Sequence, residues 1–329
     1  MRVVTTLPAA TESVAALGIE PVGVSHECDH PSGVAQLPAV TSSSIDASAS
    51  SEEIDRQVLE TDGDSGLYEV DGELLESLDP DLIVTQATCD VCAVDEAVVD
   101  RALEGTSIGP DVLTVDPHSV DDVLIDLKRL GEATNRDERA ARVVSSLEAR
   151  IESVRTRAED RSLNADSNLR PRVTVLDWTN PVMVAGHWTA ELVEWAGGEY
   201  GLAESGAPSR PREWGDIRAY DPEVLVVAPC GFGLEQTAAN LDDLTTMDGW
   251  EELTAVQEGR AWAMDGHHYL NRPGPRLIDT LEHLAPIVSP ARFDSPTEAV
   301  AIPFEALDAL ESSESAGRPS SRERTSSGV

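Results

Sequence analysis

The feature that most constrains this chain is an amphipathic stretch near its middle, from Asn135 to Arg161. Its apolar residues recur at gaps of three and four, which places them in one stripe along one face of an α-helix. They are Ala140, Val143, Val144, Leu147, Ile151, Val154 and Ala158. Asn135, followed three residues later by Glu138, predicts a capping box at the helix start. Such a helix, rising ~1.5 Å per residue, is long enough to connect two compact lobes.

Short apolar segments alternate with helical patterns on both sides of this stretch, which indicates parallel α/β sheets. A weak internal repeat supports two equivalent halves, because Leu78-Asp79-Pro80-Asp81-Leu82-Ile83-Val84 resembles Tyr220-Asp221-Pro222-Glu223-Val224-Leu225-Val226. Each copy reads as the end of a helix, an Asp-Pro turn and a strand. We therefore predict an α/β fold of two Rossmann-like lobes with parallel sheets, joined by a single long rigid helix.

The same patterns predict how the chain is divided. The expected parts are an N-terminal α/β lobe at 1–118, a helical connection with the long helix at 119–161, a polar linker at 162–171 and a C-terminal α/β lobe at 172–290. The pattern then weakens, and Ser, Arg, Glu and Gly dominate the end of the chain. We expect 291–329 to be a weakly structured to disordered extension.

The charge of the chain is strongly acidic, with a formal net charge of -37 over 329 residues and Lys128 as the only lysine. An acidic surface repels nucleic acid and anionic membranes, so neither is an expected partner. Acidic residues spread along the whole chain indicate adaptation to high salt, and we expect a halophilic host. No apolar run reaches the ~18 residues of a membrane span. No signal segment or lipidation cysteine follows Met1, so we predict a cytoplasmic protein.

Unusual side chains are concentrated directly after predicted strands. In open α/β sheets, ligands bind at the carboxyl ends of the strands, because the loops there face one crevice. We therefore predict a shared cleft between the lobes, although loops after strands are generally polar. The candidate ligand-binding residues are Pro8, Ala9, Thr11, His26, Glu27, Asp29, Asp90, Trp178, Asn180, His187, Trp188, Gly231, Phe232, His267, Tyr269, Arg272 and Arg276.

The four cysteines leave three interpretations open. Cys89 and Cys92 have the spacing of half a zinc site or of a redox dithiol, and Cys28 and Cys230 would complete a zinc or iron–sulfur site if the cleft closes. A single C-x-x-C motif is also compatible with reduced, partly buried thiols. A chain of this length does not need disulfides for stability.

Several other candidates have structural alternatives. His267 and His268 are neighbours at a predicted strand end, so they are expected to point to opposite sides. Arg272 and Arg276 fit a carboxylate or a phosphate, or a nearby Asp. Glu12, in the first turn of a predicted helix, is expected to stabilise the helix dipole. No nucleophile elbow, P-loop or G-x-G-x-x-G motif is present, so we expect binding without catalysis.

In addition, the chain resembles a known family over Val3 to about Leu284. The matching segments, in order, are Leu7-Pro8-Ala9-Ala10-Thr11-Glu12, Val22-Gly23-Val24-Ser25 with Asp29 and Pro31, Pro80-Asp81-Leu82-Ile83, Asn180-Pro181 with Gly186, Gly197-Gly198-Glu199, and Pro275-Arg276. They resemble the helical-backbone (class III) solute-binding proteins of ABC importers, including those for vitamin B12. The resemblance implies two lobes on a rigid helix, a corrinoid between them and little hinge motion.

The resemblance also implies a permease partner. Family members dock through one acidic residue on each lobe, about seven positions before the proline of each Asp-Pro-like turn. That position is Glu73 in the first lobe and Gly215, with Asp216 beside it, in the second. The chain departs from the family in two ways. It shows no export signal, and its loops are rich in cysteine.

Two functions follow as hypotheses. The first is a monomeric protein that binds cobalamin or a related corrinoid, as an ABC-importer substrate-binding protein or as an intracellular binder. Trp178, Trp188 and Phe232 would pack against the ring, and His26, His267 or a cysteine would ligate cobalt. A haem or siderophore binder is the near neighbour of this hypothesis. The alternative is a cytoplasmic protein that uses zinc, an iron–sulfur cluster or thiols to act on a metal complex.

Overall fold

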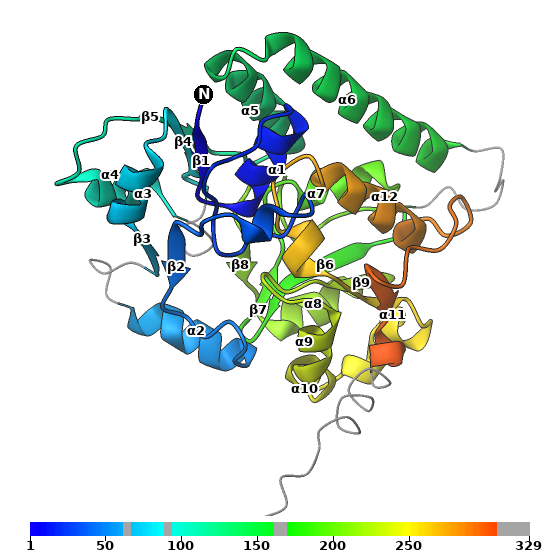
Figure 1. The fold of residues 1–329 in the computed structure, drawn as a ribbon. Helices are drawn as coiled ribbons and strands as arrows, with labels where there is room; N and C mark the ends of the chain where they lie inside the picture. Colours follow the sequence, from blue (N-terminus) through cyan, green and yellow to red (C-terminus); the bar gives the residue numbers. More distant parts are fainter. Residues whose placement is uncertain (62–66, 89–93, 161–169, 308–329) are drawn as a thin grey trace, which may run out of the picture.

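The computed structural model describes residues 1–61, 67–88, 94–160 and 170–307. The described chain forms two α/β lobes, and a pair of helices, α5 (Val120–Ala133) and α6 (Asp137–Glu159), connects them (Figure 1). The predicted fold class is confirmed. The connection differs in detail from a single helix, because α5 and α6 pack against each other as a hairpin.

The first lobe is built on a parallel sheet with the strand order β1-β4-β5. Its strands are β1 (Val3–Thr5), β4 (Leu82–Gln86) and β5 (Asp111–Val115), beside an antiparallel pair of β2 (Thr41–Ser43) and β3 (Tyr68–Val70). Its helices are α1 (Pro8–Ala16), α2 (Ser51–Glu60), α3 (Gly72–Leu78) and α4 (Glu96–Leu103). The strand β4 is buried throughout, as expected for the centre of a parallel sheet.

The second lobe has a larger, mixed sheet with the order β11-β10-β9-β6-β7-β8. Its strands are β6 (Val173–Thr179), β7 (Val182–Val184), β8 (Arg210–Pro211), β9 (Val224–Val227), β10 (Ala261–Met264) and β11 (Ala301–Pro303). Its helices are α7 (Thr189–Trp195), α8 (Trp214–Tyr220), α9 (Leu234–Ala239), α10 (Asp242–Thr245), α11 (Thr254–Gln257) and α12 (Leu277–Val288). Among the described strands of this sheet, only β6, β9 and β10 pair in parallel, so the expected parallel arrangement holds at the centre of the sheet and not at its edges.

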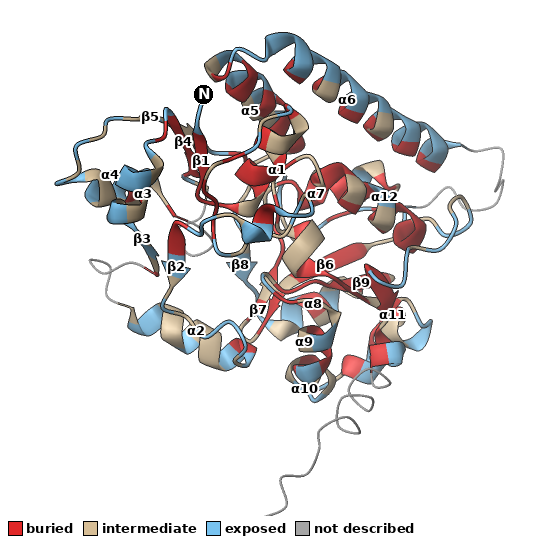
Figure 2. Ribbon diagram, in the orientation of Figure 1, coloured by how far each residue is buried: buried red, intermediate tan, exposed pale blue. Residues whose placement is uncertain are grey.

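The apolar stripe of α6 is buried as predicted, except that Val143 is only half-buried, and the outer face of the helix is exposed (Figure 2). Val144, Leu147 and Ile151 pack into the core of the second lobe, whereas Ala140 joins the core of the first. The hairpin is therefore shared by both cores. Because one packed element belongs to two cores, it restricts how far the lobes can move apart.

The start of α6 differs from the prediction. Asn135 has a left-handed backbone with φ of 55°, and the helix begins two residues later at Asp137. Arg136 is the cap residue, and its side chain makes no capping hydrogen bond. The tight turn from α5 to α6 needs one left-handed residue, and Asn tolerates that conformation better than most. The predicted capping box of Asn135 and Glu138 is therefore wrong.

The internal repeat is present in three dimensions. Asp79 and Asp221 both end a helix in the left-handed conformation, with φ of 42° and 47°. An arginine directly precedes the first strand of each lobe. Its Nε donates to the carbonyls at the C-terminal end of the helix of the repeat, which is α3 in the first lobe and α8 in the second. Arg2 reaches Leu78 O and Asp79 O at 2.7 and 3.2 Å, and Arg172 reaches Tyr220 O and Asp221 O at 3.0 Å each. The two lobes therefore share one local design.

The end of the described chain is more ordered than predicted. Within 291–329, β11 pairs antiparallel with β10, and Ile302, Phe304 and Leu307 pack into the core of the second lobe. The apolar runs in this segment are too short to predict a buried strand within such a polar sequence. Residues 308–329 lie outside the described part. Among the described helices, none combines the length and the apolar character that a membrane crossing requires.

Candidate functional site

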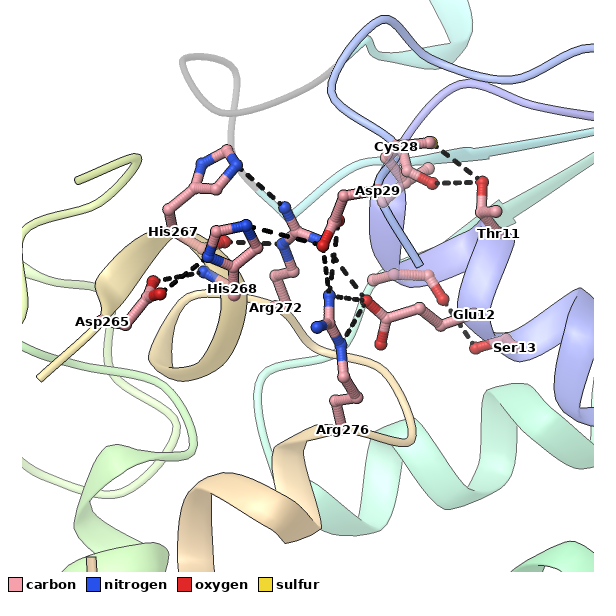
Figure 3. Close-up of polar contacts among 12 residues, drawn as sticks. Thr11, Glu12, Ser13, Cys28, Asp29, Asp265, His267, His268, Arg272 and Arg276 are labelled. Carbon is pink, nitrogen blue, oxygen red and sulfur yellow. Dashed lines mark hydrogen bonds and ion pairs between the residues drawn. The ribbon is translucent and has the colours of Figure 1, made fainter. Parts of the chain in front are cut away.

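Polar side chains from the two lobes meet where the loops after β1 and β10 face each other (Figure 3). The first lobe contributes Thr11 and Glu12 from α1, and Cys28 and Asp29 from the loop that follows Val24. The helix α1 begins at Pro8, whose fixed φ suits the first helical position. The side chain of Glu12 in this helix faces the second lobe.

The second lobe contributes a short π-helix, η3 (Gly266–Leu270), and the turn that leads into α12. Asp265 caps η3 by accepting a hydrogen bond from the backbone N–H of His268 at 2.8 Å. Arg272 and Arg276 follow and point back toward α1. Single-turn π-helices are rare and occur frequently at functional sites.

Arg272 is the most buried cation of this region, with its side chain 5% exposed. Its Nη1 donates to Asp29 Oδ1 and, at 3.4 Å, to Glu12 Oε1. Its Nε donates to the carbonyl of His267 at 2.6 Å, and its Nη2 lies 3.2 Å from His267 Nε2. The guanidinium is therefore held by carboxylates of the first lobe and by the backbone of the second.

Arg276 completes the connection. Its Nε and Nη2 donate to Glu12 Oε1 at 2.9 and 2.7 Å, and Nη2 lies 3.4 Å from both oxygens of Asp29. Its guanidinium also lies over the ring of Tyr269, 5.7 Å from the centroid. Glu12 thus forms ion pairs across the lobe boundary and does not act through the helix dipole, because the first turn of α1 contains no acidic residue.

The two neighbouring histidines both face this region, contrary to the prediction that they point to opposite sides. Their rings are 4.4 Å apart and nearly perpendicular, at 88°. The backbone turns into η3 after β10 and does not continue as a strand, which removes the two-residue alternation. His268 lies between two carboxylates, with Nδ1 2.7 Å from Asp265 and Nε2 3.5 Å from Asp29.

These six residues, Glu12, Asp29, His267, His268, Arg272 and Arg276, are called the interlobe charge cluster below. Burial alone would raise the pKa of the Asp29 carboxyl, but its hydrogen bond and charge contact with Arg272, with Arg276 and His268 adding to them, lower it. Burial, reinforced by the positive charge of Arg272, lowers the pKa of His267 to about 4. His267 is therefore neutral at pH 7 and keeps a lone pair on Nε2.

The cysteine predictions are only partly within the described residues. Cys28 is buried and its Sγ lies 3.0 Å from Thr11 Oγ1, and burial raises the pKa of its thiol to about 11. A protonated thiol is a poor metal ligand. Cys230 follows β9, and its backbone N–H donates to Asp177 O at 2.9 Å. Cys89, Asp90 and Cys92 lie outside the described residues. Within the described ranges, no group of three or more His, Cys, Asp or Glu could hold a metal ion.

The predicted aromatic residues of the second lobe pack together. Trp178 and Phe232 lie 5.2 Å apart and are almost fully buried. The Trp178 indole donates to the carbonyl of Asn180 at 3.0 Å. Gly231, next to Phe232, is exposed and has a positive φ of 80°. Because both rings are buried here, a ligand would reach them only if neighbouring groups moved, and their contact with a ligand stays a prediction.

His187 makes a second contact between the lobes, and Trp188 packs beside it within the second lobe. The two rings stack at 5.4 Å, and the Trp188 indole donates to Leu270 O at 2.9 Å. His187 Nδ1 lies 3.3 Å from Nδ1 of His118, which comes from the segment before α5 and pairs with Asp116 at 3.1 Å. Burial lowers the pKa of His187, and the neighbouring His118 lowers it further.

The remaining predicted residues lie apart from the cluster or at its rim. His26 is exposed and bonds to Thr41 Oγ1 at 2.7 Å, and the N–H of Glu27 bonds to Ser25 Oγ at 3.3 Å. Ala9, in contrast, lies directly against the second lobe. A Cβ added at Gly274 would come within 3.1 Å of Ala9 O, so this close approach of backbones favours glycine.

Sequence reasoning missed Glu12, Asp265 and His268 as members of the site. Asp265 directly follows a predicted strand, which was an available signal of the same kind that identified His267. The burial of Glu12 gave no such signal, because a glutamate in a helix is normally exposed. Its partners lie 260 and 264 residues away in the sequence.

The fold and the interlobe site define a two-lobed binding protein scaffold, and comparison with known proteins agrees. A sequence profile of the periplasmic binding protein family matches residues 3–266, and the chain belongs to this family. An uncharacterized ABC transporter substrate-binding lipoprotein, YvrC of Bacillus subtilis (strain 168), is 22% identical over 307 residues, which cover 89% of this chain and 81% of the relative.

Solved structures of the same fold include binding proteins from several bacteria. A periplasmic heme-binding protein of Pseudomonas aeruginosa has a TM-score of 0.66 at 21% identity, covering 91% of this chain and 96% of its own. The periplasmic heme-binding protein RhuT of Roseiflexus sp. RS-1 has 0.63 at 23%, with 88% and 98% covered. The vitamin B12 binding protein BtuF of Vibrio cholerae has 0.60 at 21%, with 88% and 97% covered.

The predicted cytoplasmic location is wrong. The family is periplasmic, and the relative from Bacillus subtilis (strain 168) is a lipoprotein, which both point away from the cytoplasm. The prediction rested on the residues after Met1, and the beginning of a sequence is no evidence on this point. The intracellular corrinoid binder loses its basis with it, as does the cytoplasmic setting of the metal- or thiol-dependent alternative, which otherwise rested on the cysteines.

Proposed function

We propose that this protein is the substrate-binding protein of an ABC importer and that its ligand is a flat metal chelate, namely cobalamin or a related corrinoid, with haem as the near alternative. The ligand would bind between the lobes. The observation that carries the proposal is the convergence of side chains from the loops after β1 and β10 on one interlobe region, at the carboxyl ends of parallel strands.

The chemistry of this region suits such a ligand. His267 is neutral at pH 7, so its imidazole is in the form that ligates a metal ion. Arg272 and Arg276 are fixed cations that would exchange the carboxylates of Glu12 and Asp29 for acidic or polar groups of the ligand. Solved structures of the same fold include proteins named for vitamin B12 and for heme, which supports this ligand class.

The permease partner is part of the proposal. Glu73 and Asp216 are both exposed, and each lies in the first turn of the corresponding helix of the repeat, α3 in one lobe and α8 in the other. One acidic side chain on each lobe would contact cations of the permease. In a reconstituted importer, replacing both residues with lysine would abolish stimulated ATP hydrolysis and leave ligand affinity unchanged. Loss of ligand affinity, or unchanged stimulation, would contradict this assignment.

Ligand binding is tested directly with two probes. Purified protein is mixed with aquocobalamin or, separately, with haemin, and calorimetry and the visible spectrum are recorded. We expect one-to-one binding of at least one of them, with a shift of the visible bands if His267 ligates the metal. The variant His267→Ala should lose that shift, whereas His30→Ala, an exposed histidine of the first lobe, should keep it. No heat and no spectral change with either probe would refute the proposed ligand class.

A further inference from the structure

The interlobe charge cluster has an unusual origin, because its acids come from one lobe and its guanidinium groups from the other. Glu12 and Asp29 belong to the first lobe, and Arg272 and Arg276 lie 243 or more residues further along the chain. Figure 3 shows the two sets pointing toward each other across the boundary. Two carboxylates face two guanidinium groups, so their formal charges cancel.

Burial couples these ion pairs to the closed arrangement of the lobes. The side chains of Glu12 and Arg272 are 2% and 5% exposed. A charge at such a position is costly unless it is paired, and it returns to water only if the lobes separate. Removing one partner therefore leaves an uncompensated charge. Opening the boundary relieves that cost without unfolding either lobe.

The pairs are not fully satisfied. Glu12 Oε1 accepts from both arginines, whereas Glu12 Oε2 is buried and has no hydrogen-bond partner among the described residues. Water would satisfy this oxygen in an open arrangement. The cluster thus stabilises closure through its charges and retains one feature that favours opening, as a reversible contact requires.

Hydrogen bonds also close the boundary at a second place, between the segment around the start of α2 and the helices α9 and α10. The backbone N–H of Ser51, at the start of α2, donates to Asn240 Oδ1 at 3.1 Å, and Gln236 donates to Ala47 O at 2.7 Å. A third hydrogen bond runs from the Ser51 hydroxyl to the carboxylate of Asp243. Among these contacts, the charge cluster alone pairs opposite charges across the boundary, so removing one partner there leaves a buried charge unpaired.

We propose that the interlobe charge cluster is a latch that holds the two lobes closed in the absence of a ligand. Asp29 and Glu12 occupy Arg272 and Arg276, and opening requires these ion pairs to break. The proposal concerns the protein without ligand, so it does not depend on which ligand the protein binds.

The test uses the full chain without ligand and three variants. Asp29→Asn removes one carboxylate at a partly exposed position, and Glu12→Gln with Asp29→Asn removes both. The control, Arg218→Gln, breaks two ion pairs within the second lobe, one with Asp248 and one with Glu252. Hydrogen exchange by mass spectrometry follows the two faces of the boundary, at residues 8–16 and 266–276, and small-angle scattering follows the overall dimensions.

We expect both faces to exchange faster together in Asp29→Asn, roughly tenfold, which corresponds to about 1.4 kcal/mol of closure free energy. The radius of gyration should rise in the same variant, and the strands β6 and β9 and the control should be unchanged. If the double variant fails to fold, Asp29→Asn alone decides, because that side chain is 34% exposed and tolerates an amide. A folded Asp29→Asn protein with the exchange and scattering of the wild type would overturn the latch.

Discussion

Arg272 is the residue on which the two faces of the site converge, and it determines the properties of its neighbours. Its guanidinium bonds to Asp29 and lies beside the imidazole of His267. One buried cation therefore favours the ionised form of a carboxyl group and the neutral form of an imidazole. At pH 7 the site consequently holds an anionic carboxylate and a neutral histidine that contact the same guanidinium group.

The pKa of His267 gives a prediction at this scale. Burial and the charge of Arg272 lower this pKa to about 4 in the folded protein, against ~6.5 in an unfolded chain. Between these values the unfolded state binds the extra proton, so His267 makes stability rise with pH through this window and fall as the pH drops. NMR titration of the folded protein should place His267 near pH 4, and a midpoint at or above pH 6 would contradict the site geometry.

At the scale of elements, η3 depends on close contact with the loop after β9. A Cβ at Gly266 would lie 2.2 Å from Pro229 O and 2.5 Å from Ala228 O, and neither backbone carbonyl can move easily. Gly266→Ala should therefore cost about 1–3 kcal/mol of unfolding free energy, as overpacking typically does. Gly233→Ala, where nothing lies within 4 Å, is the matched control and should change stability little. Urea unfolding of both variants measures the difference, and equal stability would show that η3 is not held in this way.

The elements also show what the sequence could and could not predict. The spacing of Val144, Leu147 and Ile151 identified α6, because burial of a helical stripe follows directly from periodicity. The start of α6 was missed, because the backbone of Asn135 is determined by the turn from α5 and not by its neighbours in sequence. The Asp-Pro turns at Asp79 and Asp221 were predicted because two local copies supported each other.

The site was less predictable than the fold for the same reason. The loops after strands were correctly expected to contain Asp29, His267 and Arg272, since strand order brings such loops together. The pairing of Arg276 with Glu12 was not predictable from one sequence, because it depends on the relative placement of two lobes. Whether a charged side chain faces a ligand or another side chain is a property of that placement.

At the scale of the whole molecule, the net charge of -37 makes the compact state repel itself. Raising KCl from about 0.1 M to about 1 M shortens the Debye length from ~10 Å to ~3 Å and weakens this repulsion. The thermal unfolding midpoint should therefore rise by several degrees over this range. KCl is preferable to sulfate, which also strengthens apolar burial. A midpoint that stays constant or falls would contradict the proposed adaptation to high salt.

We propose that the region between the lobes binds a flat metal chelate. Its most direct test is native mass spectrometry of the protein after incubation with aquocobalamin and haemin together, followed by removal of unbound compound. We expect a one-to-one complex whose added mass matches one of the two compounds, and loss of that complex in Arg272→Gln. Detection of the unliganded protein alone, in a preparation whose fold is verified, would contradict it.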